Sequence, residues 1–125
     1  MNRINKSNIT GKEGESEAQR FLERKGYRIL HKNWRWHHYE LDIVAATPDG
    51  LIVFVEVKTR GKDCLLSPEE SVDNAKIRRI VMAADAYIRK YNISVPARFD
   101  IVSLTGVPGE FDITHIEDAF LAPVH

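Results

Sequence analysis

The chain has 125 residues with 18 basic and 18 acidic side chains, and hydrophobic residues make up 43% of it. This composition is typical of a globular protein and excludes a disordered tail, and the length favours one domain. An apolar run such as Leu51 to Val55 is far shorter than the roughly 20 residues of a membrane-spanning helix. Because the first residues also lack the apolar centre of a signal peptide, we expect a cytoplasmic protein with no membrane partner. The lone Cys64 excludes a disulfide framework and a multi-cysteine zinc site, and we interpret it as a small loop residue.

The net charge of zero argues mildly against a nucleic-acid-binding protein, but the charges are unevenly distributed along the chain. Residues 1–38 carry nine basic and four acidic side chains, and residues 58–91 carry eight and five. Between them, residues 39–57 hold four acidic side chains and no lysine or arginine. An acidic cluster between two basic segments would suit a metal site facing a phosphate backbone. An unevenly charged solvated surface is the alternative.

The first predicted element is a helix over residues 11–25. Thr10 and Glu13 have the spacing of a capping box at its start, and Gly26 stops it. Glu15 shares its face with the apolar stripe formed by Ala18, Phe21 and Leu22, so it points along the buried side of the helix. An acid in the first turn, favoured by the helix dipole, is the structural alternative for Glu15.

Three strands follow, over residues 27–36, 40–46 and 51–58, and the last two form a hairpin around Thr47-Pro48-Asp49-Gly50. Pro48 suits the second position of a type I turn, and Gly50 suits the left-handed residue after it, which predicts a three-residue loop. Paired residue numbers then sum to 98, and Asp42 lies directly across from Glu56. A four-residue loop would instead pair Asp42 with Val55 and send Glu56 to the other face.

A loop over residues 59–67 carries Arg60 and Lys62, and a long helix follows it. The helix starts either in the segment Ser67-Pro68-Glu69-Glu70 or at Asp73 as N-cap. Its predicted core stripe is Ile77, Ile80, Val81, Ala84, Tyr87, Ile88 and Tyr91.

Positive charge near the start of this helix works against the helix dipole, which favours a phosphate ligand, with a solvated face as the alternative. The three basic residues there are Lys76, Arg78 and Arg79. Residues 98–104 and 113–116 are predicted to be further strands. We expect residues 1–10 to be a flexible segment, residues 11–120 one domain, and residues 121–125 a tail.

Glu15, Asp42, Glu56 and Lys58 stand out because local structure gives them no reason to be where they are. Glu56 interrupts an apolar strand, and Lys58, two residues later, projects from the same face as Glu56 and Asp42. Two facing carboxylates repel each other and lose solvation, and a divalent cation between them would relieve both costs. Oxygen ligands without a cysteine pair favour Mg²⁺ or Mn²⁺. A structural ion pair at the end of the sheet is the alternative. We interpret His31, His37, His38, His115 and His125 as surface histidines.

Several motifs occur in a fixed order: GKEGESEAQRFLERKGYRIL, NWR, ELDIVA, LIVFVEVKTR, SPEESV with Lys76, and RFDIV. In these motifs the chain resembles the bacterial YraN-type family, which is similar to Holliday-junction resolvases of the restriction-endonuclease-like PD-(D/E)XK nuclease superfamily. The resemblance implies an α/β fold with a central mixed sheet flanked by helices, in the order α-β-β-β-α-β-β. The superfamily's aspartate falls on Asp42, its (D/E)XK pair on Glu56 and Lys58, and its helical glutamate on Glu15. Tyr39 stands where the family usually has glycine.

The resemblance implies a metal-dependent endonuclease acting on nucleic acid, most simply DNA, and by analogy a homodimer. Asp42, Glu56 and Glu15 would bind Mg²⁺ or Mn²⁺, and Lys58 would orient water or neutralise charge. Flanking phosphates would be held by Arg60, Lys62, Lys76, Arg78 and Arg79. Two alternatives are a non-catalytic nucleic-acid-binding module with the same fold and a protein-interaction domain. Glu40 is either a peripheral acid of this site or an exposed charge.

Overall fold

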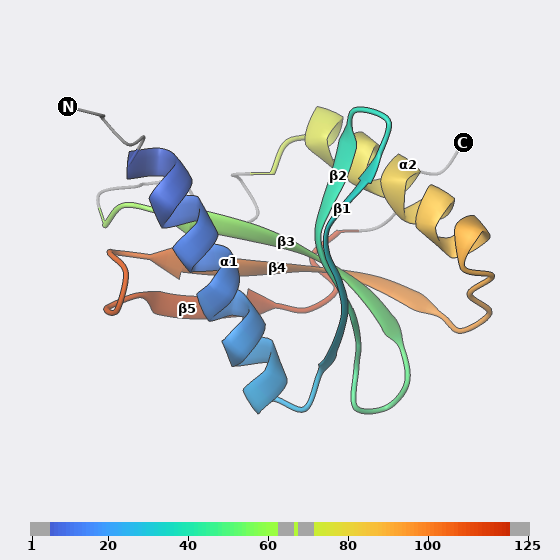
Figure 1. Cartoon of the computed structure of the whole chain (residues 1–125), viewed down its shortest axis with the longest axis horizontal. Helices are drawn as coiled ribbons and strands as arrows, with labels where there is room; N and C mark the ends of the chain where they lie inside the picture. The colour runs from blue at the N-terminus through green and yellow to red at the C-terminus, as the bar shows by residue number, and fades with distance from the viewer. Residues whose placement is uncertain (1–5, 63–66, 68–71, 121–125) are drawn as a thin grey trace.

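A five-stranded sheet with two helices forms the core of this computed structural model, which describes residues 6–62, 67 and 72–120 (Figure 1). Cys64 and the candidate helix start at residues 68–70 lie outside these residues. The strands lie side by side in the order β1-β2-β3-β4-β5, and every neighbouring pair is antiparallel except the parallel pair β3–β4. The predicted mixed α/β fold is therefore confirmed. Its elements are α1 (Lys6–Arg24), β1 (Arg28–Trp36), β2 (Tyr39–Ala46), β3 (Ile52–Arg60), α2 (Asn74–Lys90), β4 (Ala97–Thr105) and β5 (Asp112–Ile116).

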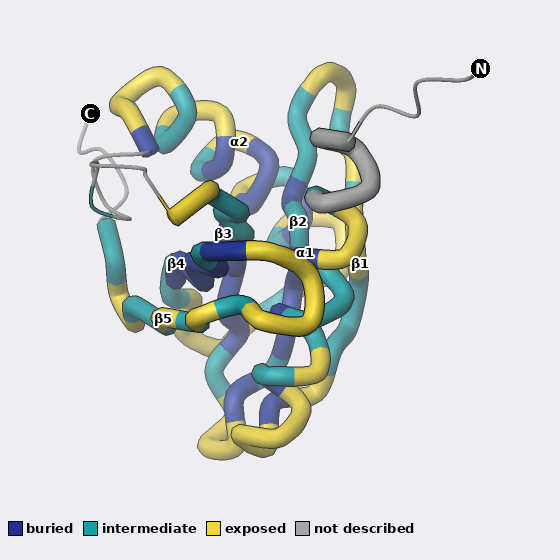
Figure 2. The backbone as a smooth tube through the Cα atoms, turned by 90° about the vertical axis from the view of Figure 1, so that its left-hand side faces the viewer, coloured by how far each residue is buried: buried dark blue, intermediate teal, exposed yellow. Residues whose placement is uncertain are grey.

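The two helices cover opposite faces of the sheet (Figures 1 and 2). Alternate side chains of a strand point to opposite faces. Val53 and Val55 of β3 accordingly pack in the cluster that contains Ala18 and Leu22 of α1. Phe54 packs in the other cluster, beside Tyr87 of α2. Because β3 is covered on both faces, its first half is apolar throughout, as expected for a central strand.

The predicted hairpin register between β2 and β3 is confirmed from the turn to Ile43 and Val55, but the ladder ends before the predicted pair of Asp42 with Glu56. Four pairs, from Ala46 with Ile52 to Ile43 with Val55, have numbers that sum to 98. Thr47 and Leu51 close the loop through a backbone hydrogen bond of 2.8 Å, and Gly50 adopts the left-handed conformation with φ of 91°. The turn chemistry therefore sets which residue of β2 faces which residue of β3.

The buried stripe of α2 and the start of α1 differ from prediction. Helix α2 starts at the second predicted N-cap, Asp73, whose side chain accepts the backbone N–H of Lys76. Its buried stripe includes Ala83, whereas Tyr91 is exposed because it already lies past the end of the helix. Helix α1 begins at Lys6, so Thr10 lies inside it and the capping box predicted at residues 10–13 is wrong. Among the described helices, none is both long and apolar enough to cross a membrane.

His115 is not the surface histidine that the sequence predicts. Its side chain is 3% exposed, because the pairing of β5 with β4 brings it 2.7 Å from the fully buried carboxylate of Asp100. Arg98 donates two hydrogen bonds to the same carboxylate, and the backbone N–H of Asp118 donates a third. Lys25 at the end of α1 donates to the other ring nitrogen of His115. This network joins α1, β4 and β5.

Gly14 sets how closely α1 approaches the sheet, and we expect Gly14→Ala to destabilise the protein. A Cβ atom at this buried position would collide with Oγ1 of Thr59 on β3 and lie 3.3 Å from its Cβ. Overpacking of this kind typically costs about 1–3 kcal/mol, against the roughly 1 kcal/mol that alanine adds to helix propensity. Urea unfolding should show the loss.

Thr59→Ala removes the colliding oxygen and supplies the control. The double variant Gly14→Ala/Thr59→Ala should recover most of the lost stability, with a coupling free energy of about 1 kcal/mol or more in a double-mutant cycle. Additive effects of the two changes would mean that this contact does not set the position of α1.

Candidate active site

Asp42 lies where β2 and β3 separate. The two strands run together from their turn and then diverge, and their last residue pair is Ile43 with Val55 (Figure 1). In a continued antiparallel ladder, the N–H of Val57 would bond to the backbone carbonyl of Leu41. The carboxylate of Asp42 instead accepts this N–H at 2.9 Å. The end of the ladder therefore places the Asp42 side chain between the two strands.

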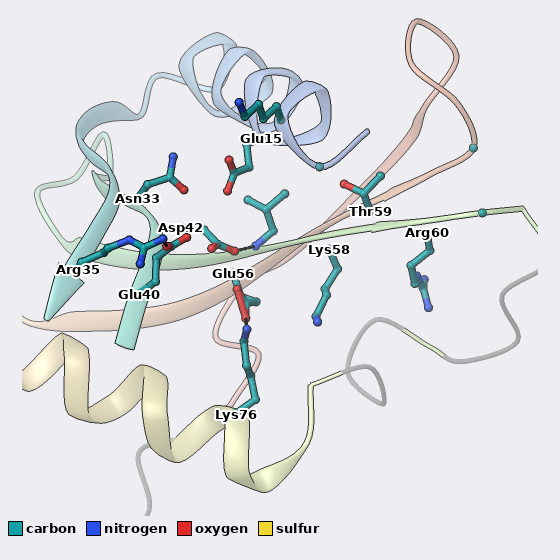
Figure 3. Close-up of a pocket in the computed structure, with 15 residues that line it drawn as sticks. Glu15, Asn33, Arg35, Glu40, Asp42, Glu56, Lys58, Thr59, Arg60 and Lys76 are labelled. Carbon is teal, nitrogen blue, oxygen red and sulfur yellow. Dashed lines mark hydrogen bonds and ion pairs between the residues drawn. The ribbon is translucent and has the colours of Figure 1, made fainter. Parts of the chain in front are cut away.

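Glu56 is a buried carboxylate next to Asp42. It continues the α2-facing positions of β3 after Phe54, and its side chain is only 5% exposed. Its Oε2 accepts no hydrogen bond within the described residues and forms a long ion pair, of 3.4 Å, with Nζ of Lys76 on α2 (Figure 3). A buried carboxylate oxygen left in this state is costly unless a further ligand satisfies it.

The proximity of Glu56 changes the protonation of Asp42. Burial, a hydrogen bond with Glu56 and the charge of Glu56 together raise the pKa of Asp42 to about 8. The N–H of Val57 and the charge of Lys76 act in the opposite direction but do not outweigh them. At neutral pH, and in the absence of another cation, Asp42 therefore retains its proton.

Glu15 and Glu40 approach Asp42 from the other side. Carboxylate oxygens of Glu15, Glu40 and Asp42 all lie within 4.8 Å of one another. Burial and the charges of these two neighbours raise the pKa of Glu15 above its ordinary value. Asn33 holds the group together: with its amide nitrogen facing the acids, it donates to Glu15 at 3.0 Å and to Glu40 at 3.2 Å. Arg35 also forms an ion pair with Glu40 at 3.0 Å.

The four acids line an open cleft of about 890 Å³ that also carries a basic rim (Figure 3). Lys58 is half buried and projects to the same side of β3 as Glu56. Lys76 extends from α2 toward Glu56. Arg60 extends this rim along β3 and donates to Ser103 at 3.3 Å. The basic residues that line the cleft are Lys12, Arg35, Lys58, Arg60 and Lys76.

The cleft gathers most of the residues selected from the sequence. Its lining includes Glu15, Asp42, Glu56, Lys58, Arg60 and Lys76. Lys62 and Arg78 do not line it, and Arg79 lines a neighbouring groove instead. Glu56 contacts Asp42 but does not belong to the group formed by Glu15, Glu40 and Asp42, so Asp42 links Glu56 to that group.

Sequence reasoning gave no role to Asn33 and left Glu40 undecided. Asn33 has a φ of 52°, a left-handed conformation that asparagine tolerates better than most residues. The register of the first hairpin offers a signal for it, since pairs such as Lys32 with Ile43 have numbers that sum to 75. The same sum places Asn33 across from Asp42.

The donors fit a hard divalent cation. Four carboxylates line the cleft, without sulfur or imidazole among the residues described there. Oε2 of Glu56 has room for a further ligand because it accepts no hydrogen bond within the described residues, and burial beside Glu56 raises the pKa of Asp42. Oxygen donors of this kind favour Mg²⁺ or Mn²⁺ over softer metals.

Known proteins include chains that are similar to this one over nearly its whole length. The family model "Uncharacterised protein family UPF0102" matches residues 14–104, which include all four acids. A UPF0102 protein of Parabacteroides distasonis is 62% identical over 118 residues, covering 94% of this chain and 97% of the relative. A UPF0102 protein of Bacteroides thetaiotaomicron is 51% identical, covering 94% of this chain and 96% of the relative. One of Flavobacterium psychrophilum is 41% identical, covering 90% of this chain and 94% of the relative.

Proposed function

The chain belongs to the uncharacterised protein family UPF0102, the YraN-type family, and we propose that it is a metal-dependent endonuclease that hydrolyses phosphodiester bonds of nucleic acid. One observation carries this proposal. Asp42 and Glu56 form a carboxylate pair at the point where two strands diverge, and Lys58 stands two residues from Glu56 in the same cleft. Such a site can combine a bound cation, a positioned water and a positive side chain at one phosphate.

Asp42, Glu56 and Glu15 are the residues that would hold Mg²⁺ or Mn²⁺, with Glu40 close enough to contribute. A bound divalent cation would polarise the scissile phosphate and favour deprotonation of a water. The proton retained by Asp42 has to leave when a cation binds, since carboxylates bind metals in the ionised form. Binding should therefore strengthen as the pH rises toward about 8.

The side chains of the basic rim bind the phosphates of the substrate. Lys58 donates hydrogen bonds to a phosphate oxygen and compensates the charge that develops on it during attack. Arg60 and Lys76 lie on either side of Lys58 in the cleft lining and hold the neighbouring phosphates of the strand. DNA, including branched DNA, is the proposed substrate, and a homodimer is the proposed active form by analogy with junction resolvases.

Cleavage by the wild type and by Glu56→Gln tests the proposal. Glutamine keeps the size of the side chain but removes the charge, so we expect loss of cleavage by a factor of about 100 or more, the scale of losing a central catalytic group. The assay uses branched, flapped, duplex and single-stranded substrates with Mg²⁺ or Mn²⁺. Circular dichroism of the variant should remain that of the wild type.

Calorimetry with Mn²⁺ separates this proposal from the binding-module alternative. The wild type should bind Mn²⁺, and Glu56→Gln should bind it at least several times more weakly. A matched control is Glu110→Gln, an exposed acid in the β4–β5 connection. Binding of DNA without Mn²⁺ affinity or cleavage would indicate a non-catalytic module instead.

A further inference from the structure

A second groove adjoins the active-site cleft on the side of α2. It has a volume of about 430 Å³ and shares Glu40, Asp42 and Lys76 with the larger cleft. Its remaining lining residues are His38, Tyr39, Arg79 and Ile80. A ligand bound in this groove would therefore lie directly beside the acidic pair proposed to act on the phosphate.

One wall of the groove is the aromatic tip of the β1–β2 hairpin, which rises beside the first turns of α2 (Figure 1). Trp36 stacks on Tyr39, with ring centres 5.6 Å apart and planes inclined by 20°. His37 contacts Trp36 edge-on at 4.4 Å and does not line the groove, whereas the neighbouring His38 is exposed and does. The stack holds the Tyr39 ring in place, which gives the wall a fixed aromatic surface.

The opposite wall is basic. Lys76 and Arg79 are three residues apart on α2 and share one helix face, which also carries Ile80. Arg79 is exposed and Lys76 partly exposed, so both can reach a phosphate. Arg78, also exposed, does not line this groove. An aromatic wall facing two cations is the combination that binds an unpaired base together with its phosphate.

We propose that this groove binds an unpaired nucleotide next to the scissile phosphate, so that the enzyme selects substrates with single-stranded or branched character. The inference rests on the proposed nuclease function and specifies its substrate. A base inside a duplex has both faces covered by its neighbours, so an aromatic wall contributes binding only to a base outside the stack. The aromatic wall thus adds to the phosphate contacts of the basic rim a contribution that only an unpaired base can use.

Tyr39 acquires a role in this arrangement. The sequence places a bulky residue here beside the site, where a glycine would let a duplex backbone approach closely. In the structure Tyr39 forms part of the adjoining groove. The side chain that hinders duplex approach is thus the one that contacts an unpaired base.

Fluorescence anisotropy with a labelled oligo(dT) of 12 nucleotides tests whether the groove binds an unpaired nucleotide. A blunt duplex of equal length serves as competitor, and EDTA prevents cleavage. The wild type should prefer the single strand. Arg79→Ala should weaken this binding about tenfold, as expected when a stacked nucleotide loses its phosphate partner, and Arg78→Ala less than threefold. His38→Asn should likewise exceed His37→Asn in effect, although both exchange an exposed histidine in the same turn.

Equal losses within each matched pair, or equal affinity for the duplex, would overturn the inference. Tyr39→Leu distinguishes binding from a structural role, because leucine keeps an apolar contact with the core but removes the aromatic face. A lower melting temperature without a change in the preference for single strands would also overturn it. All these measurements need no catalysis. Failure of Glu56→Gln to reduce cleavage would therefore reject the nuclease mechanism separately from the groove.

Discussion

Asp42→Asn is expected to abolish cleavage and, in the absence of divalent cations, to make the protein more stable at pH 8. Cleavage should fall by about three orders of magnitude, since a carboxylate at the centre of the site is lost. Asparagine resembles the protonated aspartic acid, because its oxygen can still accept the N–H of Val57 and its amide can donate to Glu56. The variant therefore keeps the hydrogen bonds of Asp42 without its charge.

The pH dependence of stability follows from the raised pKa of Asp42. The unfolded chain loses the proton of Asp42 near pH 3.8, whereas the folded chain keeps it up to about pH 8. Between these values the folded state binds more protons, so the free energy of unfolding falls as the pH rises, by up to about 1.4 kcal/mol per pH unit. Asp42→Asn should lack this decline.

Thermal unfolding in EDTA at pH 5 and pH 8 provides the measurement. The wild type should lose stability between these values, and Asp42→Asn should lose much less. Asp112→Asn, the same exchange at an exposed residue of β5, serves as the control and should behave as the wild type does. If Asp42→Asn melted at a lower temperature than the wild type at pH 8, the raised pKa of Asp42 would be contradicted. Undiminished cleavage would remove Asp42 from the mechanism.

Asp100→Ala is expected to cause the largest loss of stability, although Asp100 does not line the cleft. Its fully buried carboxylate accepts hydrogen bonds from Arg98, His115 and the backbone of Asp118. Breaking a buried ion pair by removing one partner costs about 3–5 kcal/mol, because the other partner is left uncompensated. Urea unfolding at pH 7 should show this loss, whereas Asp112→Ala on the exposed side of β5 should change stability by less than about 0.5 kcal/mol.

The same carboxylate should make the wild type sensitive to acid. Burial by itself raises the pKa of Asp100, but the hydrogen bonds from His115, Arg98 and the Asp118 backbone outweigh burial and lower it below 3.8. The unfolded chain is then the state that binds a proton first as the pH falls. The stabilisation is complete above pH 3.8 and is lost as the pH falls through the lower folded value. An unfolding free energy that stays constant through this range would show that Asp100 does not hold the network together.

Sequence alone determined the central pair of the candidate site. Pro48 and Gly50 specify a three-residue loop, which sets the register up to Ile43 and Val55 and brings Asp42 and Glu56 together just past the end of the ladder. The two-residue period of a strand places Lys58 on the face of Glu56. These features depend on local turn chemistry and on side-chain alternation, which act within a few residues and can be read along the chain. Asp73 could be predicted as an N-cap for the same reason, since the capping hydrogen bond joins residues three apart.

Tertiary structure alone decided the rest. Glu40 joins Glu15 because α1 crosses the sheet as closely as Gly14 allows, and Asn33 holds both acids from a third element. The distinction between Arg78 and Arg79 depends on where the β1–β2 hairpin meets α2, and His115 is buried only because β5 pairs with β4 beside Asp100. Each of these contacts joins segments far apart in the chain, and their packing geometry is not encoded in any short-range pattern.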